Sequence, residues 1–299
     1  MTEVHYHCGY VAIIGRPNTG KSTLLNRVLG QKISITSNKP QTTRHRILGI
    51  HTSENAQVLY VDTPGLQAEA RSAINRYMNR TASNVLHDVN VILFMVEAMV
   101  WGHEDEQVLK RIKDCSVPVV LVINKVDKIK NKEQLMPFLQ KLSAMYDYSE
   151  IIPLSASKGD NVDMLENKVE TLLPANPPMY PEDQVTDKSM RFIVAEIIRE
   201  KLMRRLYKEL PYSLTVEIEL YEEENDKVLI HAIIWVERES QKGIVIGKKG
   251  EGLKSVGTQA RQDIQKILGV KVVLKLWTKV RGGWSDDERH LRSFGYTDD

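Results

Sequence analysis

Four short stretches in the first half of the chain have the residue types, and the order along the sequence, that would hold one ligand. They are Gly15-Arg16-Pro17-Asn18-Thr19-Gly20-Lys21-Ser22, Asp62-Thr63-Pro64-Gly65, Asn124-Lys125-Val126-Asp127 and Ser155-Ala156-Ser157. The first stretch suits phosphates, the second suits a magnesium ion, and the last two suit guanine. No other common ligand needs all four, so the sequence predicts a guanine-nucleotide site.

The first stretch fits the pattern G-x-x-x-x-G-K-S, between an apolar run at residues 10–14 and a helical pattern at residues 23–29. Strand, glycine-bounded turn and helix are the context in which this pattern binds phosphate. Glycine at both ends lets backbone N–H groups close around a phosphate, and the helix adds the positive end of its dipole. We expect Lys21 to reach the outer phosphates and Ser22 to ligate Mg²⁺. The predicted phosphate-binding residues are Gly15, Asn18, Thr19, Gly20, Lys21, Ser22 and Thr23.

The magnesium ligands are predicted from a strand end and a polar loop. The apolar run at residues 58–61 ends at Asp62, at the edge where α/β sheets bind ligands. We expect Asp62 to hold Mg²⁺ through water and the Gly65 N–H to meet the γ-phosphate. A threonine from the polar stretch 39–46 would complete the metal shell when the γ-phosphate is present. Thr43 is the favoured ligand and Thr42 the alternative, and an ordinary surface loop is the structural alternative to both.

The guanine contacts follow two further buried-strand patterns, at residues 119–123 and 151–154. A carboxylate at Asp127 can accept from both N1–H and the N2 amine of guanine, a pair of donors that adenine does not offer. The Lys125 stem would cover the ring, and Asn124 would either read the base or tie the loops together. A backbone N–H of Ser155 or Ala156 would meet guanine O6.

The expected reaction is in-line attack of water on the γ-phosphate, with Lys21, Thr43, Mg²⁺ and the loop backbone as the catalytic groups. In Ras-like GTPases a glutamine orients this water, directly after the Asp-x-x-Gly turn. Here Leu66 stands at that place, and Gln67 is one residue too far along. A monovalent cation such as K⁺ beside the phosphates, held in part by Asn18, could take over the role. Asn18 could equally be a turn residue only, and the sequence leaves both readings open.

Length and composition favour two domains in a reducing compartment. The 299 residues exceed one typical domain, and 2 cysteines provide no disulfide framework. We expect a cytoplasmic protein, because the first motif begins too early for a signal peptide and no apolar run is long enough to span a membrane. The net charge of +2 conceals an asymmetry, since residues 238–281 contain eleven basic and three acidic side chains, a net charge of +8. Such a stretch indicates a polyanionic partner.

A proline-rich segment separates the two predicted domains. Residues 174–187 include four of the 11 prolines, so a helix cannot continue through them and a stiff, extended linker is expected. The predicted division is a GTP-binding domain at 1–174, a linker at 175–188 and a second domain with a C-terminal tail at 189–299.

The second domain reads as helix, strand, strand, short helix, glycine-lysine loop, helix and strand. Its first helix has apolar residues at helical spacing, and its other face carries Arg199, Arg204 and Arg205. The strands are expected at 213–220, 228–236 and 270–280, with residues 222–227 as the hairpin loop. Two lysines between two glycines would let a nucleic-acid backbone approach while cations neutralise its phosphates, as in KH domains. The predicted RNA-binding residues are Gly247, Lys248, Lys249, Gly250 and Lys254.

Taken together, these motifs closely resemble the Era family of bacterial GTPases over essentially the whole chain. The resemblance includes Gln41-Thr42-Thr43-Arg44, the loop around Gly247 and the closing Gly283-Trp284-Ser285-Asp286-Asp287-Glu288-Arg289. It implies an α/β P-loop GTPase domain, with a mostly parallel sheet and helices on both faces, followed by an α+β type II KH domain. It also implies a monomeric, GTP-hydrolysing switch that binds small-subunit ribosomal RNA near its 3′ end, not DNA, and acts in maturation of the small ribosomal subunit. Some peripheral association with the cytoplasmic face of the inner membrane is implied as well.

Two other readings compete with this one. In the first, the basic helix around Arg204 and Arg205 is a membrane or partner surface, and the second domain is only a docking module. In the other, the chain is a metabolic P-loop enzyme that phosphorylates a small molecule. The Asn124-Lys125-Val126-Asp127 stretch argues against the latter because it selects guanine.

Overall fold

The computed structural model describes residues 6–65 and 72–296 of the chain. The expectations placed on Leu66 and Gln67 therefore lie outside the described residues. The chain forms two compact units, which divide between Asp187 and Lys188, but short segments of the first half belong to the second unit.

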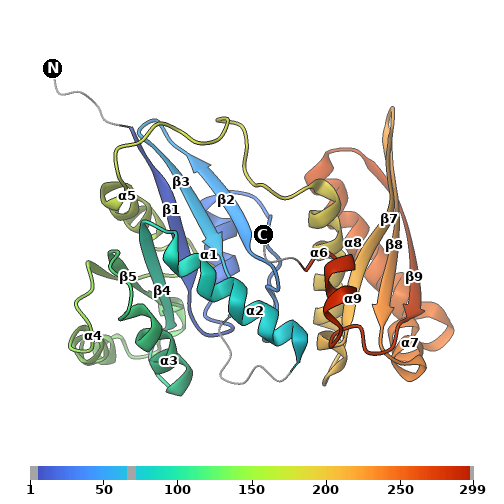
Figure 1. Ribbon diagram of the computed structural model, residues 1–299, viewed down its shortest axis with the longest axis horizontal. Coiled ribbons are helices and arrows are strands. Elements are labelled where there is room, and N and C mark those ends of the chain that lie inside the picture. The colour runs from blue at the N-terminus through green and yellow to red at the C-terminus, as the bar shows by residue number, and fades with distance from the viewer. Residues whose placement is uncertain (1–5, 66–71, 297–299) are drawn as a thin grey trace. The chain divides into compact units, whose positions relative to one another are not determined.

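The first unit is a six-stranded sheet in the order β2-β3-β1-β4-β5-β6, in which β2 alone is antiparallel to its neighbour (Figure 1). The strands are β1 (His7–Ile14), β2 (Ile47–Thr52), β3 (Ala56–Asp62), β4 (Val91–Glu97), β5 (Val119–Asn124) and β6 (Glu150–Pro153). The helices are α1 (Lys21–Val28), α2 (Ala73–Asn84), α3 (His103–Ile112), α4 (Leu135–Ser143) and α5 (Val162–Leu172).

Helices cover both faces of this sheet. On one face Ala12 and Ile14 of β1 share a core with α3 and α4, while Ile13, between them, is also fully buried. On the other face α1 contacts β3, and α5 contacts β1 and β3. Strands buried on both faces read as continuous apolar runs, which is how they appear in the sequence. The predicted mostly parallel α/β domain is confirmed.

The proline-rich segment is extended and hydrogen-bonded to the first unit. The Cys8 N–H donates to the Pro174 carbonyl at 3.1 Å, and the Ile50 N–H donates to the Val185 carbonyl at 2.8 Å. The Gln57 side chain, near the start of β3, is fully buried and bonds the backbone of Tyr180. These contacts hold the segment along the strands β1, β2 and β3.

The second unit has a three-stranded sheet in the order β7-β8-β9, with β7 antiparallel and β9 parallel to β8. Its elements are α6 (Met190–Arg205), β7 (Leu214–Glu224), β8 (Lys227–Val236), α7 (Glu239–Ile246), α8 (Glu251–Leu268), β9 (Lys271–Val280) and α9 (Glu288–Ser293). Figure 1 shows α6 and α8 side by side against the sheet, and their apolar residues share one core with it. This is the predicted KH order, although the strands extend further into the hairpin than expected.

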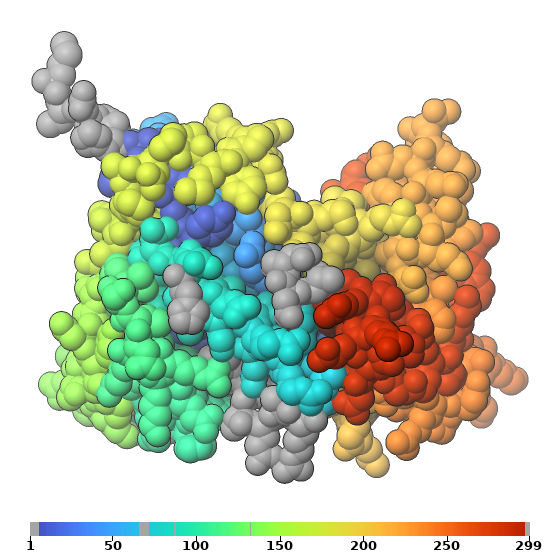
Figure 2. Space-filling view, in the orientation of Figure 1, coloured from blue at the N-terminus to red at the C-terminus, as the bar shows by residue number. Residues whose placement is uncertain are grey.

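Two segments from the first half of the chain are part of the second unit: Ile35–Thr42 and the beginning of α2 as far as Tyr77. The Ala73 N–H donates to Asp286 Oδ1 at 3.1 Å, and the Tyr77 and Tyr296 rings meet edge-to-face at 5.6 Å. In the space-filling view the residues around α9 lie beside the start of α2 (Figure 2). Among the described residues, no helix is long and apolar enough to cross a membrane.

Candidate nucleotide site and nucleic-acid interface

The phosphate loop connects β1 to α1 and is held by contacts within itself. The ammonium of Lys21 donates to the carbonyls of Gly15 and Arg16 at 2.9 and 3.0 Å, and the Thr19 hydroxyl donates to the Arg16 carbonyl at 3.1 Å. Gly20 has φ 105°, and a Cβ there would lie 2.2 Å from Asn124 Nδ2. Only glycine fits this position, so the loop geometry is the reason for the second glycine of the motif.

Three side-chain hydroxyls converge on one oxygen of Asp62, at the end of β3. Oδ2 of Asp62 accepts from Ser22 Oγ at 2.7 Å, Ser34 Oγ at 3.0 Å and Thr43 Oγ1 at 3.4 Å. The hydroxyls of Ser22 and Thr43 are 2.9 Å apart. The structure therefore brings together the three predicted metal ligands and adds Ser34, which the sequence analysis missed.

This cluster fits Mg²⁺. Hydroxyl and carboxylate oxygens are the ligands that Mg²⁺ prefers, and Mg²⁺ commonly takes few protein ligands together with substrate phosphates and water. Asp62 Oδ1 is buried and makes no hydrogen bond within the described part of the chain. In residues 6–65 and 72–296 no three His, Cys, Asp or Glu side chains gather to hold a metal.

Burial perturbs both charged groups of the phosphate site. It lowers the pKa of Lys21 to about 8, although the carboxylate of Asp62 opposes the shift and Arg16 adds to it. Burial also raises the pKa of Asp62, against the effect of Lys21 and of the three hydroxyl donors. Burial disfavours the charged forms of both groups. A bound anion would stabilise the charged form of Lys21, and a bound cation that of Asp62.

Asn124 ties three loops together. The residue is 3 % exposed, and its side chain donates from Nδ2 to the Thr19 carbonyl at 2.7 Å. Its Oδ1 accepts from the backbone N–H groups of Lys125 at 2.8 Å and Ala156 at 3.0 Å. Asn124 was predicted either to read the base or to tie the loops together, and these contacts support the second role. Because the Ala156 N–H is engaged here, a bond from it to guanine O6 would have to be shared.

The other side chains predicted to contact guanine, Lys125 and Asp127, bond to polar groups of other loops. Lys125 donates to the Asn18 carbonyl and to Glu97 Oε2, both at 2.7 Å. Burial would raise the pKa of Glu97, but the hydrogen bond and charge of Lys125, with the charge of Arg16, hold it below its usual range. Asp127 Oδ1 accepts from Ser155 Oγ at 2.6 Å. Asp127 is thus positioned by a residue of the fourth motif.

Arg27 is a further residue that the sequence analysis missed. It lies in the last turn of α1 and donates to the carbonyls of Ala156 at 3.1 Å and Ser157 at 2.6 Å. A basic residue in the last turn of a helix is too common a feature to indicate this contact in advance.

Asn18 has φ 65° in the phosphate loop, a conformation that asparagine tolerates well. This supports its role as a turn residue and leaves its role toward a cation a prediction.

The predicted RNA loop lies between α7 and α8 in the second unit. Gly247 has φ 73°, and a Cβ there would be 2.9 Å from the Gly252 nitrogen. Lys248 and Lys249 are exposed at the tip, and Lys254 is exposed on the first turns of α8. Ile244, one turn before the loop, is an apolar side chain that is 60 % exposed. Exposed cations beside an exposed apolar side chain suit the phosphates and bases of a single-stranded RNA.

The three arginines predicted on one face of the first helix differ in exposure. Arg204 and Arg205 are exposed, but Arg199 is 1 % exposed. It is buried because Glu196, one turn earlier, pairs with it at 2.6 Å. The helical spacing that places Arg199 opposite the apolar stripe does not show that this face is covered too.

Fold and site together define a P-loop GTPase joined to a KH domain. A family model described as 50S ribosome-binding GTPase matches residues 10–125, and one described as KH domain matches residues 209–285. GTPase Era of Pseudomonas aeruginosa (strain PAO1) is 53% identical over 304 residues, covering 100% of both chains. GTPase Era of Coxiella burnetii (strain Dugway 5J108-111) is 57% identical over 290 residues, covering 97% of this chain and 98% of the relative. The chain belongs to the GTPase Era family.

Solved structures agree with this assignment. An Era variant of Aquifex aeolicus bound to GDP and AlF₄⁻ superposes with a TM-score of 0.94 at 40% identity, covering 97% of this chain and 99% of that one. Era in complex with MgGDPNP and nucleotides 1506–1542 of 16S ribosomal RNA superposes with a TM-score of 0.95 at 41% identity, covering 98% and 100%. The predicted family, fold and GTPase activity are confirmed.

Proposed function

We propose that this GTPase is a switch in maturation of the small ribosomal subunit, and that its KH domain binds single-stranded ribosomal RNA near the 3′ end. The observation that carries the proposal is the exposed Lys248-Lys249 loop in a stretch of net charge +8. The 41% identical Era that was solved with nucleotides 1506–1542 of 16S ribosomal RNA supports the choice of RNA.

We assign the roles at the nucleotide site from the contacts described above. Lys21 neutralises the outer phosphates, and Asp127 with Asn124, Lys125, Ser155 and Ala156 holds guanine. Ser22, Thr43 and Asp62 would hold Mg²⁺, which supplies charge to the phosphoryl oxygens when it is bound. Thr43 is the threonine of choice because its hydroxyl reaches Asp62, whereas the Thr42 hydroxyl donates to the Lys39 carbonyl at 2.7 Å.

The RNA proposal is tested with a labelled single-stranded RNA from the 3′ end of small-subunit ribosomal RNA. Binding is measured for wild type, Lys248→Ala/Lys249→Ala and a control, Lys110→Ala/Lys141→Ala, which removes two exposed lysines of the first unit. We expect the loop variant to lose affinity and to reduce the salt slope by about 2, while the control behaves as wild type. Equal affinity of the loop variant would favour the reading in which the KH domain is a docking module.

Nucleotide control of RNA binding is tested by the same titration with GDP and with a non-hydrolysable GTP analogue. A difference between the two affinities supports a switch, whereas equal affinities would mean that the two activities are independent. Exchange of K⁺ for Na⁺ in the hydrolysis assay tests the monovalent cation, which remains a prediction. A monomeric state, a cytoplasmic location and peripheral membrane contact also remain predictions, the last from the family resemblance alone.

A further inference from the structure

The segment Thr36–Thr42, which leads directly into Thr43, is bound along its length by one helix, α6. Both belong to the second compact unit, whereas Thr43 itself belongs to the first. The division between the units thus falls between Thr42 and the residue that we assign to the metal. Thr43 is therefore covalently attached to a segment that belongs to the second unit, while its hydroxyl bonds Ser22 and Asp62 of the first.

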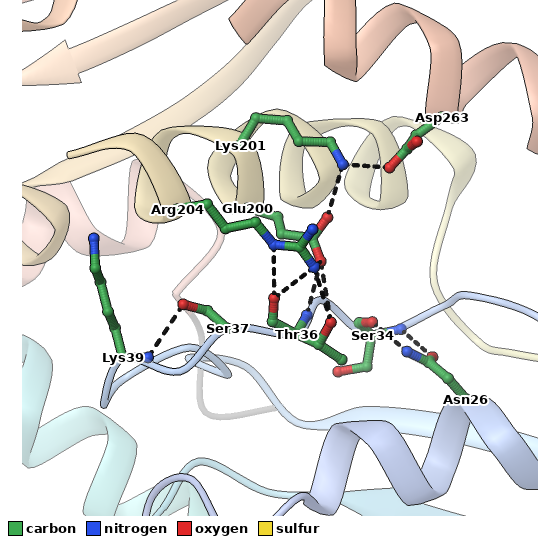
Figure 3. Close-up of polar contacts among 9 residues, drawn as sticks. All are labelled: Asn26, Ser34, Thr36, Ser37, Lys39, Glu200, Lys201, Arg204 and Asp263. Carbon is green, nitrogen blue, oxygen red and sulfur yellow. Dashed lines mark hydrogen bonds and ion pairs between the residues drawn. The ribbon is translucent and has the colours of Figure 1, made fainter. Parts of the chain in front are cut away.

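At the start of the segment, Glu200 accepts two hydrogen bonds from Thr36. Its Oε1 lies 3.0 Å from the Thr36 nitrogen and 3.3 Å from the Thr36 hydroxyl, and the carboxylate is fully buried (Figure 3). Arg204, one turn later on α6, bonds Glu200 at 2.9 Å and the Thr36 carbonyl at 3.1 Å. Thr36 therefore has its N–H, hydroxyl and carbonyl all bound by the same helix.

At the end of the segment, Arg199 donates to the Thr42 carbonyl. Its guanidinium is aimed by two bonds to Glu196, at 2.6 and 2.7 Å. In the middle, the ammonium of Lys39 donates to the carbonyls of Met203 and Leu206, at the C-terminal end of α6. Helix ends attract cations because their last carbonyls are unpaired.

A gain in folding stability does not by itself explain why α6 carries the buried charges of Glu196, Arg199 and Glu200. A buried ion pair commonly adds little net stability, because desolvation offsets the attraction, so apolar residues would serve a packing role as well. What the charged groups provide is fixed geometry at both ends of the segment. Lys201 extends the network in Figure 3, since it bonds Glu200 at 3.3 Å and reaches Asp263 on α8, the helix that follows the Gly247–Gly250 loop.

We propose that Arg199 and Glu200 are positioning residues for GTP hydrolysis, which fix the segment Thr36–Thr42 so that the Thr43 hydroxyl meets the metal site beside Ser22 and Asp62. The proposal rests on the role assigned to Thr43 above. It predicts that weakening the attachment to α6 reduces the affinity for Mg²⁺ in the GTP-bound state. Binding of GDP, whose phosphate and guanine contacts lie elsewhere, stays unchanged.

The test compares the Mg²⁺ concentration that gives half-maximal GTP hydrolysis among four full-length variants. Glu196→Gln/Arg199→Met removes the guanidinium without leaving a buried carboxylate unpaired, and Thr36→Val removes the hydroxyl bond from the segment side. Arg199→Lys keeps a cationic donor, so its Mg²⁺ requirement should rise less than that of the double variant. Arg205→Met is the control, since it is exposed on the same helix. The expected result is a rise of about tenfold for the double variant, as for loss of one charge-assisted hydrogen bond, and no change for the control.

Two further measurements separate the explanations. GDP affinity and thermal stability are measured for each variant, because a purely structural role would lower stability without moving the Mg²⁺ requirement. Wild-type Mg²⁺ dependence in both the double variant and Thr36→Val would overturn the positioning role. Thr43→Val tests the underlying assignment: if it too has the Mg²⁺ dependence of wild type, the role of Thr43 fails, whereas a raised requirement in Thr43→Val alone rejects only the part played by α6.

Discussion

Replacement of Asn124 by alanine should weaken nucleotide binding although this side chain need not touch the nucleotide. The change removes three hydrogen bonds, to the Thr19 carbonyl and from the N–H groups of Lys125 and Ala156. Each neutral bond contributes about 1 kcal/mol, so the loops lose about 3 kcal/mol of mutual stabilisation. If the nucleotide must restore that order when it binds, the affinity for GDP falls about 100-fold.

The assay is a titration with a fluorescent GDP analogue, together with thermal unfolding of the nucleotide-free protein. Asn131→Ala is the matched control, because Asn131 is exposed and its side chain accepts from Glu133, two residues along the same loop. We expect the control to bind like wild type. An Asn124→Ala protein with wild-type affinity and wild-type unfolding temperature would refute the view that these bonds hold the pocket together.

Three further predictions concern single groups of the first unit. Gly20→Ala should abolish nucleotide binding in the same titration, since its Cβ would lie 2.2 Å from Asn124 Nδ2 and φ is 105°; measurable binding would contradict the loop geometry. Burial lowers the pKa of Lys21 to about 8, so the free protein loses this proton above pH 8 while bound phosphate would retain it. GDP affinity should therefore fall as pH rises from about 8 towards 10.5, and a Lys21→Arg variant should show a flatter profile. Burial, with the charges of Asp163 and Glu170, raises the pKa of Glu166 to about 7, so its contribution to stability is present below pH 4.5 and lost as pH rises to about 7. Glu166→Gln should reduce the change in unfolding temperature between pH 5 and 8. A variant whose unfolding temperature varies with pH as in wild type would reject this account.

The four motifs predicted to bind the nucleotide could be located from the sequence because each is a local pattern. Each motif follows an apolar strand, and parallel strands bring their carboxyl ends to one edge of the sheet, so strand order alone gathers Asp62, Asn124 and Ser155. The KH domain was predictable for a similar reason. Its order of elements is distinctive, and a glycine at Gly247 is required by the backbone itself.

The partners of these residues were not predictable. Ser34, Arg27 and Glu200 act through contacts with residues far away in the sequence, and their types and spacing carry no local signal. Arg199 shows the problem most clearly, because a charged residue opposite an apolar stripe predicts exposure, and its burial depends on Glu196 and on a segment more than 150 residues earlier. Sequence patterns locate groups that bind a ligand, but not the groups that hold them in place.

The way the chain divides has a consequence for how its two activities can influence each other. The two compact units do not follow the order of the sequence, since Thr36–Thr42 and the start of α2 lie in the unit that contains the KH sheet. The first of these segments leads directly into Thr43, the threonine that we assign to the metal. A displacement of α6 would therefore act on Thr43 through its peptide bond to Thr42, whose carbonyl accepts from Arg199. If RNA binding and the nucleotide influence each other along this route, we expect the coupling to require the hydrogen bonds at Thr36 and Thr42.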